Sequence, residues 1–464
     1  IEVHDCICFL ADCVLAGGIR RSSLICLFSH DDDEMVRAKH SDSFRYPWGD
    51  DAGLNPQRAM ANNSAVIVRS LPDREAVFRK LFKVSMENYG DPGFLVSEST
   101  EYACNPCAEA LGDPALKSAS VTDAMRVFYK ARNLVDLVAG QNPSGFYFCN
   151  LCEVNAAVAM DATELVDAAR AAAFIGTLQA SYTDFPFLGP ITESITRRCA
   201  LLGVGLTGMC DNPGVAFDPL ALEAAAGAVV EENRRVADLI GINPTQRAAV
   251  IKPSGTASLV LNCVGSGIHP HHAKRYFRRV TANPGEPVAQ LFQRTNPHMV
   301  ETKPNGDWCI TFPVQAPDGA ETVKDQPWQL FLERLRIVYK HWILPGTASR
   351  GMAFENSPGL THNISSTLAA PKEEFGAVED EVAGMLDRIA AMSFLERMSD
   401  KGIPFMPREE VVTADDEVKW QNLIRHYQSV DYNQSYDEMH DRELEAACTG
   451  DRCVVDVSIP ATRS

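Results

Sequence analysis

A short polar segment, Asn105-Pro106-Cys107-Ala108-Glu109, combines three groups that could carry chemistry: an amide, a thiol and a carboxylate. Pro106 disfavours helical backbone at Asn105, so the segment is predicted to be extended or looped, and alternate residues of an extended loop point the same way. Asn105, Cys107 and Glu109 are therefore expected to face one side. The carboxylate could take a proton from a hydroxyl that the amide positions, while the thiol serves as nucleophile or radical centre. A plain loop with a buried cysteine and an exposed glutamate is the alternative.

A second thiol segment contains Cys149 and Cys152 in a Cys-x-x-Cys spacing. This spacing is typical of a redox pair or of half a zinc site. A four-cysteine zinc site would add the upstream pair of the same spacing, Cys104 and Cys107. The aromatic and aliphatic residues around Cys149 are typical of a core rather than of a zinc knuckle, but spacing alone leaves both interpretations open.

One segment could hold a phosphate. Ser254, Gly255, Thr256 and Ala257 follow a strand-like run and precede an apolar stretch. This arrangement suits a helix N-terminus whose free N–H groups bind an anion. A plain strand–turn–helix connection fits equally well, and the segment lacks the Gly-Lys-Ser/Thr end of a Walker A motif.

A loop near the N-terminus contains Gly18, Arg20, Arg21 and Ser22. The glycine permits unusual backbone angles, and adjacent arginines can reach the base or the phosphates of a nucleotide. A solvated pair of arginines on a surface loop is the alternative.

Two cysteines, Cys448 and Cys453, lie in an acidic, glycine-containing C-terminal stretch. Two thiols on a flexible segment can close a disulfide and can move, so this pair favours redox exchange over a structural role.

Three histidines, His269, His271 and His272, are close enough to suggest a metal. Because no acidic or thiol residue lies near them in the sequence, a packed loop is favoured and no metal site is expected.

Apolar spacing predicts the elements that must position these segments. Helices are predicted at residues 75–89, 121–138, 162–182, 219–240, 327–342 and 379–398. Strand-like runs are predicted at residues 23–28, 64–68, 249–252 and 309–313. Helices that alternate with short strands indicate an α/β fold with a mostly parallel sheet.

Composition excludes several classes of function. The net charge of −18 argues against binding a nucleic-acid polymer through a broad basic surface. The chain has no apolar run long enough for a membrane span, and its start lacks the features of a signal peptide. The 14 cysteines are scattered through apolar segments, which is unlike a secreted disulfide scaffold and favours the reducing cytoplasm.

Taken together, these segments resemble the adenosylcobalamin-dependent (class II) ribonucleotide reductases, above all the monomeric ribonucleoside-triphosphate reductases. The resemblance rests on short matches that keep the family's order along the chain. They are Ala16-Gly-Gly-Ile-Arg-Arg-Ser22, Ala61-Asn-Asn-Ser64, Gly90-Asp-Pro-Gly93, Asn105-Pro-Cys-Ala-Glu109, Phe148-Cys-Asn-Leu151, Lys252-Pro-Ser-Gly-Thr256, and the pair Cys448 and Cys453. The resemblance implies part of a ten-stranded α/β barrel, in which two parallel half-sheets surround a finger loop that carries Cys107.

The resemblance also implies roles for the central residues. Adenosylcobalamin would allow Cys107 to become a thiyl radical, which takes the 3′-hydrogen of a ribonucleotide. Glu109 would act as base on the 3′-hydroxyl, and Asn105 would position that hydroxyl. Cys149 resembles one of the two thiols that reduce the substrate to a 2′-deoxyribonucleotide for DNA synthesis, with triphosphates the favoured substrates.

Other segments acquire roles from the same resemblance. Cys448 and Cys453 resemble the tail dithiol that re-reduces the active site and is recharged by a thioredoxin-like reductant. Residues 254–257 resemble the cradle for substrate phosphates. The loop at residues 17–22 resembles the specificity loop that links a deoxynucleotide effector to the substrate base.

The sequence departs from the family in three respects. The second reducing cysteine, which the family carries upstream, is missing, and Cys13 is too close to the specificity loop to replace it. We therefore expect a separate or omitted N-terminal reductase segment, without which the chain is inactive. The connection between Cys107 and Cys149 is longer than in the family, so residues 113–145 are expected to be an inserted helical segment. Residues 1–412 as a whole are expected to form the C-terminal portion of the barrel, and residues 413–464 are expected to form a flexible redox tail. Ala108 replaces the family's usual glycine.

Two alternatives remain. A class I large subunit receives its radical from a partner through an adjacent tyrosine pair, and the sequence contains no Tyr-Tyr dipeptide. A non-catalytic half of a split reductase is the other, although the complete Asn-Pro-Cys-x-Glu set and the tail dithiol argue against decay.

Overall fold

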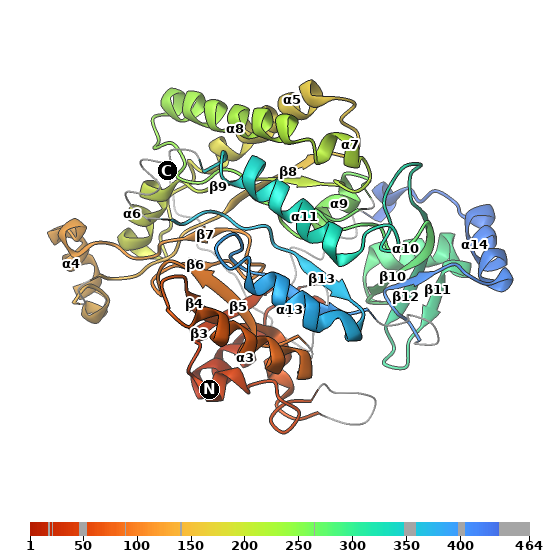
Figure 1. Ribbon diagram of the computed structural model, residues 1–464, viewed down its shortest axis with the longest axis horizontal. Coiled ribbons are helices and arrows are strands. Elements are labelled where there is room, and N and C mark those ends of the chain that lie inside the picture. Colours follow the sequence, from red (N-terminus) through yellow and green to blue (C-terminus); the bar gives the residue numbers. More distant parts are fainter. Residues whose placement is uncertain are drawn as a thin grey trace, which may run out of the picture. The chain divides into compact units, whose positions relative to one another are not determined.

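The computed structural model describes residues 1–16, 19–20, 22–45, 53–88, 90–139, 142–263, 265–347, 359–397 and 404–435 (Figure 1). Contacts divide the chain into two units. The first contains residues 1, 25–271 and 318–397, and the second contains residues 2–24, 272–317 and 398–464.

The first unit alternates helices with short strands. Its strands are β3 (Leu24–Ser29, of which Leu24 belongs to the second unit), β4 (Ala61–Val68), β5 (Gly93–Ser97), β6 (Ala103–Cys104), β7 (Leu111–Gly112), β8 (Asn150–Asn155), β9 (Leu202–Thr207), β13 (Thr367–Ala370) and β14 (Ser393–Glu396). Its α-helices are α2 (Asp33–Val36), α3 (Arg74–Glu87), α4 (Asp123–Lys130), α5 (Ala162–Gln179), α6 (Gly189–Cys199), α7 (Pro213–Ala216), α8 (Pro219–Ile240), α9 (Gly255–Val260), α11 (Trp328–Val338) and α13 (Phe375–Ala383). A π-helical turn (Tyr339–Ile343) continues α11, and short 3₁₀ turns are η1 (Pro56–Met60), η2 (Ser118–Ser120), η3 (Val135–Val138) and η6 (Lys372–Glu374).

Parallel pairing dominates the first unit, as the sequence predicts. The pairs β4–β5, β8–β9 and β13–β14 are all parallel. Parallel bridges from Val204 to Ala249 and from Ile251 to Ile364 continue the pairing through the predicted strand-like run at 249–252. The mixed α/β class is therefore confirmed. The described strands form short sheets of two to four strands and do not form a ten-stranded barrel.

Helices cover these strands because their apolar faces bury against them. Helix α5 packs on α8 and on both β8 and β9, while α3 packs on β4 and β5. Asp161 starts α5 by accepting hydrogen bonds from the N–H groups of Thr163 and Glu164, and Asp218 starts α8 by accepting one from Ala221. One large apolar cluster joins these layers and fixes the strand ends that carry the site.

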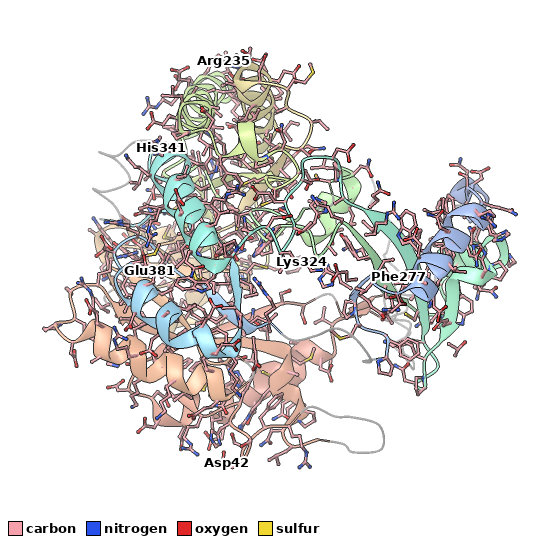
Figure 2. The ribbon with its side chains drawn as sticks, turned by 45° about the vertical axis from the view of Figure 1, so that its right-hand side comes forward. Asp42, Arg235, Phe277, Lys324, His341 and Glu381 are labelled. Atoms are coloured by element: carbon pink, nitrogen blue, oxygen red, sulfur yellow. The ribbon has the colours of Figure 1, made fainter. Side chains whose placement is uncertain are left out.

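The second unit is built around an antiparallel sheet in the order β11-β12-β10-β15. Its elements are α1 (Glu2–Asp12), β1 (Leu15–Ala16), β2 (Ile19–Arg20), β10 (Arg275–Ala282), α10 (Pro287–Thr295), η4 (Pro297–Met299), β11 (Val300–Thr302), β12 (Trp308–Gln315), β15 (Arg408–Glu410), α14 (Ala414–His426) and η7 (Tyr432–Ser435). Phe277 of β10 joins Trp420 and Leu423 of α14 in its apolar cluster (Figure 2). The expectation of a mostly parallel sheet is wrong for this unit, where the predicted run at 309–313 is antiparallel.

The predicted helices at 75–89, 162–182, 219–240 and 327–342 are confirmed within a few residues. The helix predicted at 121–138 is interrupted, because α4 and η3 are separated by a turn in which Asn133 has a φ of 57°. The helix predicted at 379–398 is wrong. There α13 ends at Ala383, before Gly384, and residues 393–396 pair as β14 with β13, so tertiary strand pairing prevails over helical spacing.

The segment predicted to be a flexible tail from residue 413 begins with an ordered helix. Thr413 and Asp416 form a reciprocal capping box that starts α14. Trp420 and Leu423 then bury against the sheet of the second unit. The part of the tail that carries Cys448 and Cys453 lies outside the described residues.

Candidate active site

Cys107 lies in a tight loop between the paired strands β6 and β7. The Ala108 N–H donates to the Asn105 carbonyl at 2.7 Å, and the Asn105 N–H donates to the Ala110 carbonyl at 3.2 Å. The segment is therefore a turn, which is the looped form of the two that the sequence predicts. The Asn105 side-chain oxygen accepts from the N–H groups of Glu109 and Ala110 at 3.1 and 3.0 Å, so this amide holds the turn closed.

Ala108, which stands where the reductase family usually has glycine, adopts a backbone conformation that favours glycine. Its φ is 57°, in the left-handed region that favours glycine. A β-carbon in that conformation costs on the order of 1–2 kcal/mol. The turn therefore keeps the geometry that a glycine would adopt without strain.

Side chains of residues 362–365 hold this turn, and the sequence analysis did not identify them. Asn363 donates from its side-chain amide to the Ala108 carbonyl at 2.9 Å, and the Ser365 hydroxyl donates to the Cys107 carbonyl at 2.5 Å. His362 accepts at Nδ1 from the Leu111 N–H at 3.2 Å. The polar run Thr361-His362-Asn363-Ile364-Ser365-Ser366 was the signal that could have revealed this support.

A fully buried cation supports the other side of the same strand. The Arg247 guanidinium donates from Nε to the Leu111 carbonyl at 3.0 Å. The Nε2 of His362 is hydrogen-bonded to the Leu202 carbonyl at 2.9 Å, which requires that nitrogen to carry the proton. Burial, together with the nearby Arg247 charge, lowers the pKa of His362 to about 3, so this histidine is a neutral support.

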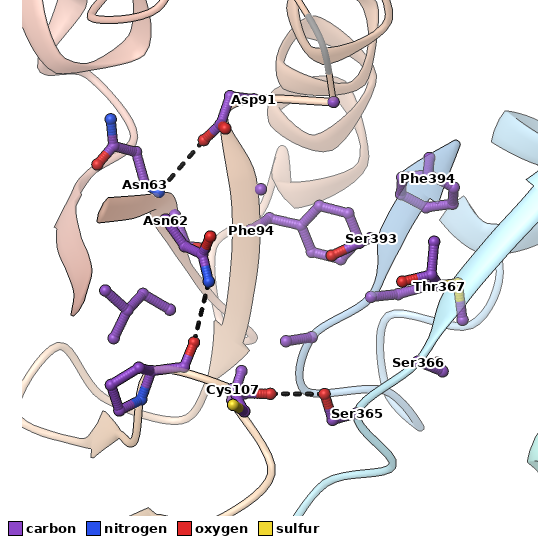
Figure 3. A pocket seen from close by; sticks show the side chains of 18 of the residues that line it. Asn62, Asn63, Asp91, Phe94, Cys107, Ser365, Ser366, Thr367, Ser393 and Phe394 are labelled. Atoms are coloured by element: carbon purple, nitrogen blue, oxygen red, sulfur yellow. Dashed lines mark hydrogen bonds between the residues drawn. The ribbon is translucent and has the colours of Figure 1, made fainter. Parts of the chain in front are cut away.

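A cavity of about 440 Å³ opens beside the turn and lies wholly within the first unit (Figure 3). Cys107 is exposed and lines it. Phe94, Met392 and Phe394 supply an apolar part of the wall. The Asn62 amide donates to the Pro106 carbonyl at 3.1 Å across the cavity edge.

One polar group on the cavity wall lacks a partner. The Ser366 side chain is 6% exposed, and its hydroxyl has no hydrogen-bond partner among the described residues. A buried hydroxyl without a partner loses free energy unless a ligand or water satisfies it. The cavity wall therefore combines apolar surface with a buried hydroxyl that no described protein group satisfies.

The thiol of Cys107 is held in its protonated form. Although Cys107 is exposed to the cavity, the protein atoms around it displace part of its hydration and raise its pKa, and the nearby Glu109 carboxylate raises it further. Glu109 itself is 3% exposed, and burial raises its pKa. A hydrogen bond from the Asn105 side chain opposes that rise, while Oε2 of Glu109 has no partner among the described residues. The predicted trio is thus brought together in one turn, but of the three only Cys107 lines the cavity, and Asn105 and Glu109 do not.

Cys149 lies near the same group of residues. Tyr147 donates from its hydroxyl to the Ala103 carbonyl at 2.8 Å, which brings the segment before β8 beside β6. Gly112 permits this approach, because a β-carbon there would lie 2.8 Å from the Tyr147 ring. Burial, followed by the Glu109 charge, raises the pKa of Cys149 to about 11, and the same two causes raise that of Cys104 to about 12.

The structure does not gather Cys104, Cys107, Cys149 and Cys152 into one group of potential ligands. The Cys152 sulfur lies against Gly176 of α5, 3.1 Å from the position of a β-carbon there. Since successive strand residues alternate, Cys152 points into the helix layer. No group of three or more potential metal ligands occurs among the described residues.

The histidines predicted to form a packed loop are engaged with protein groups. His269 is hydrogen-bonded through Nδ1 to the Ser266 carbonyl, and its Nε2 accepts from the Thr367 N–H at 3.0 Å. His271 is buried and lies 2.5 Å from the Asp211 carboxylate. The packed-loop interpretation therefore agrees with these contacts.

The predicted phosphate cradle begins α9. Ser254 precedes this six-residue helix with a φ of 52°, and Gly255, Thr256 and Ala257 form its first turn. The preceding Lys252 forms an ion pair with the buried Glu153 at 3.1 Å, and the Ser254 hydroxyl donates to the Lys252 carbonyl at 3.4 Å. The Lys252 charge opposes the rise in the pKa values of Glu109 and Cys107, which indicates that the start of α9 lies near the cysteine turn.

The residues predicted for the specificity loop and for the redox tail are not among those that the structure places at the Cys107 turn. Gly18, Arg21, Cys448 and Cys453 lie outside the described residues, and of Arg20 only the backbone, in β2, is described. Ser22 belongs to the second unit, where its hydroxyl donates to the Ala11 carbonyl at 2.8 Å.

Comparisons with known proteins come from sequence and from structure. No protein-family model matches the chain. It is 23% identical over 342 residues to the adenosylcobalamin-dependent ribonucleoside-triphosphate reductase of Lacticaseibacillus paracasei, a match that covers 65% of this chain and 40% of the relative. It is 21% identical over 345 residues to the protein of the same name from Levilactobacillus brevis, covering 66% of this chain and 41% of the relative. The matches thus span about two fifths of these relatives.

The fold has a counterpart among solved structures. A crystal structure of a B12-dependent (class II) ribonucleotide reductase matches with a TM-score of 0.63 and 15% sequence identity, covering 95% of this chain and 58% of that one. At this identity the match establishes the fold. Among the described residues, no helix is long and apolar enough to cross a membrane.

Proposed function

We propose that this chain, whose homologues are adenosylcobalamin-dependent ribonucleotide reductases, carries the radical-bearing portion of such an enzyme and converts ribonucleotides to 2′-deoxyribonucleotides. The observation that carries the proposal is the Cys107 turn. It presents a thiol to a nucleoside-sized cavity and keeps a buried carboxylate, Glu109, directly behind it.

The protonation state of Cys107 suits radical chemistry. A thiyl radical forms when a thiol loses the hydrogen of its S–H bond, so the cysteine must start in the protonated form. A nucleophilic cysteine, in contrast, must be a thiolate. The raised pKa of Cys107 keeps the hydrogen on sulfur at neutral pH. Oxidation of this thiol by one electron and loss of its proton gives a thiyl radical, which then takes the 3′-hydrogen of the ribonucleotide.

Glu109 is proposed as the acid–base group at the 3′-hydroxyl. Its raised pKa brings it closer to neutral pH, which favours reversible proton transfer. Its Oε2 is buried and has no hydrogen-bond partner among the described residues, so the protein leaves its hydrogen-bonding capacity unused. Because the oxygen of the Asn105 side chain already holds the turn, Asn105 is proposed to act mainly by orienting Glu109.

Cys149 is proposed as one of the two thiols that reduce the substrate. Its high pKa keeps it protonated, as a hydrogen donor requires. The second thiol and the strands that close the ten-stranded barrel would come from a separate or omitted N-terminal segment, because the chain matches about two fifths of its relatives. The two thiols form a disulfide as the 2′-hydroxyl leaves as water, and the Cys448–Cys453 dithiol and a thioredoxin-like reductant restore them.

The nucleotide contacts are proposals as well. Residues 254–257 would bind the substrate phosphates through the N–H groups of the first turn of α9. Gly18, Arg20, Arg21 and Ser22 would transmit the identity of a deoxynucleotide effector. Residues 113–145, which contain α4, would be an insertion relative to the family.

All described cysteines are free thiols, which supports a reducing compartment such as the cytoplasm.

The cavity fits part of the proposed cofactor. Its volume suits one nucleoside group beside Cys107, and Phe94 and Phe394 on its wall would be available to a base. It is too small to enclose a corrin ring. When bound, adenosylcobalamin supplies the one-electron oxidation of the Cys107 thiol.

The test is turnover with the upstream segment supplied. We expect adenosylcobalamin-dependent formation of deoxynucleotide from ribonucleoside triphosphates, with diphosphates assayed in parallel, and no turnover by the chain alone. Cys107→Ser should abolish turnover, whereas Cys152→Ser should retain it, because that sulfur faces α5. Turnover by the Cys107→Ser variant would refute the radical assignment.

A further inference from the structure

Two arginines lie directly opposite each other in the sheet of the second unit. Arg278 of β10 and Arg408 of β15 are register partners in an antiparallel pair. The flanking hydrogen bond from the Arg279 N–H to the Pro407 carbonyl, at 2.8 Å, makes the Arg278–Arg408 pair one of the non-hydrogen-bonded type. Side chains of such pairs lie on one face and approach most closely, so two positive charges share one small area.

Neither guanidinium forms an ion pair within the part of the chain that the structure describes. The other cross-strand neighbour of Arg278 is Phe312 of β12, which supplies no charge. Both arginines are half-buried, and the Arg408 charge adds to burial in lowering the pKa of Arg278.

On the opposite face of the same strand, the arginines form ion pairs with glutamates. Arg275 lies 2.8 Å from the Glu417 carboxylate, and Arg279 lies 2.5 Å from that of Glu409. The chain has 61 acidic and 43 basic residues, so carboxylates are plentiful. Like charges placed opposite each other destabilise a sheet. An unpaired arginine pair in such a chain therefore indicates an anion that binds between them.

We propose that Arg278 and Arg408 form a binding site for a phosphate group. A guanidinium offers a planar fork of N–H donors that matches phosphate oxygens, and two forks on one face could hold adjacent phosphates. The free polyphosphate group and the phosphates of a nucleoside triphosphate share this chemistry. The site lies within the second unit and is separate from the cavity at Cys107.

The experiment measures binding to the full chain by calorimetry, with tripolyphosphate, ATP and dATP as probes. We expect saturable binding that weakens with salt. Arg278→Gln and Arg408→Gln should each weaken it by about tenfold or more, since each removes a charge-assisted contact. Arg275→Gln is the matched control, with the same loss of charge on the other face and an expected change below about threefold.

The outcomes separate the two sources of phosphate. Tighter binding of ATP or dATP than of tripolyphosphate supports a nucleotide ligand, and equal binding supports the polyphosphate group itself. Absence of saturable binding, or an equal loss in Arg275→Gln, overturns the proposal.

Stability gives a second readout that a merely structural role would not give. Without the probes, Arg408→Gln should melt at or above the temperature of the unmodified chain, because one of two like charges is gone. It should also lose the rise in melting temperature that tripolyphosphate causes in the unmodified chain. A lower melting temperature with that rise retained would contradict the proposal. The Cys107→Ser chain should bind the probes normally, so failure of the proposed radical chemistry would be distinguishable from failure of this site.

Discussion

Replacing Asn363 with alanine should loosen the Cys107 turn at its most heavily bonded support. The Asn363 amide donates to the carbonyls of Ala108 and Ala391 at 2.9 and 3.0 Å, and its oxygen accepts from the Ala390 N–H at 3.3 Å. The side chain is 4% exposed, so water cannot readily replace these bonds. At about 1 kcal/mol for each hydrogen bond, the three together stabilise this region by about 3 kcal/mol.

The assay should report on this region alone, because a chain of two units need not unfold in one step. Hydrogen exchange measured by mass spectrometry on peptides that cover residues 104–112 and 388–394 meets this need. A loss of about 3 kcal/mol in the free energy of local opening corresponds to exchange on the order of a hundredfold faster.

Asn62→Ala is the matched control. Asn62 donates one hydrogen bond to the same loop, to the Pro106 carbonyl at 3.1 Å, from an exposed position. Its removal should cost less than about 1 kcal/mol. Equal protection in the two variants, or no change on removing Asn363, would refute the view that Asn363 fixes the turn.

Three further changes test the same site. Ala108→Gly should stabilise the chain by up to about 1 kcal/mol in urea unfolding, because relief of the left-handed φ outweighs the added freedom of the unfolded chain; destabilisation would contradict the strain. The raised pKa of Glu109 means that ionisation favours the unfolded state, so Glu109→Gln should be neutral in acid and increasingly stabilising as pH rises above the usual carboxyl pKa; a pH-independent difference in unfolding free energy would argue against it. The depressed pKa of His362, about 3, contributes stability that is lost as pH falls below about 6.5, at up to about 1.4 kcal/mol per pH unit. His362→Gln should flatten that part of the profile in acid titrations, and an unchanged slope would show that the histidine is not buried in neutral form.

The sequence predicted the long helices well, since α5 and α8 have strong apolar periodicity and aspartate caps. It failed where contacts distant in sequence decide. Residues 393–396 have helical spacing but become a strand, because β13 offers a parallel partner. The antiparallel sheet of the second unit was missed for the same reason, as its strands come from residues 275–315 and 408–410.

For the site, the residue types of the Asn105–Glu109 segment alone indicated an amide, a thiol and a carboxylate acting together, and the order of the short motifs indicated the reductase family. Only the tertiary structure decided that the segment is a turn, that Cys152 faces a helix, and that residues 362–365 hold the turn. The physical reason is that hydrogen-bond partners more than 250 positions away along the chain satisfy the backbone of this turn, and no local pattern records them.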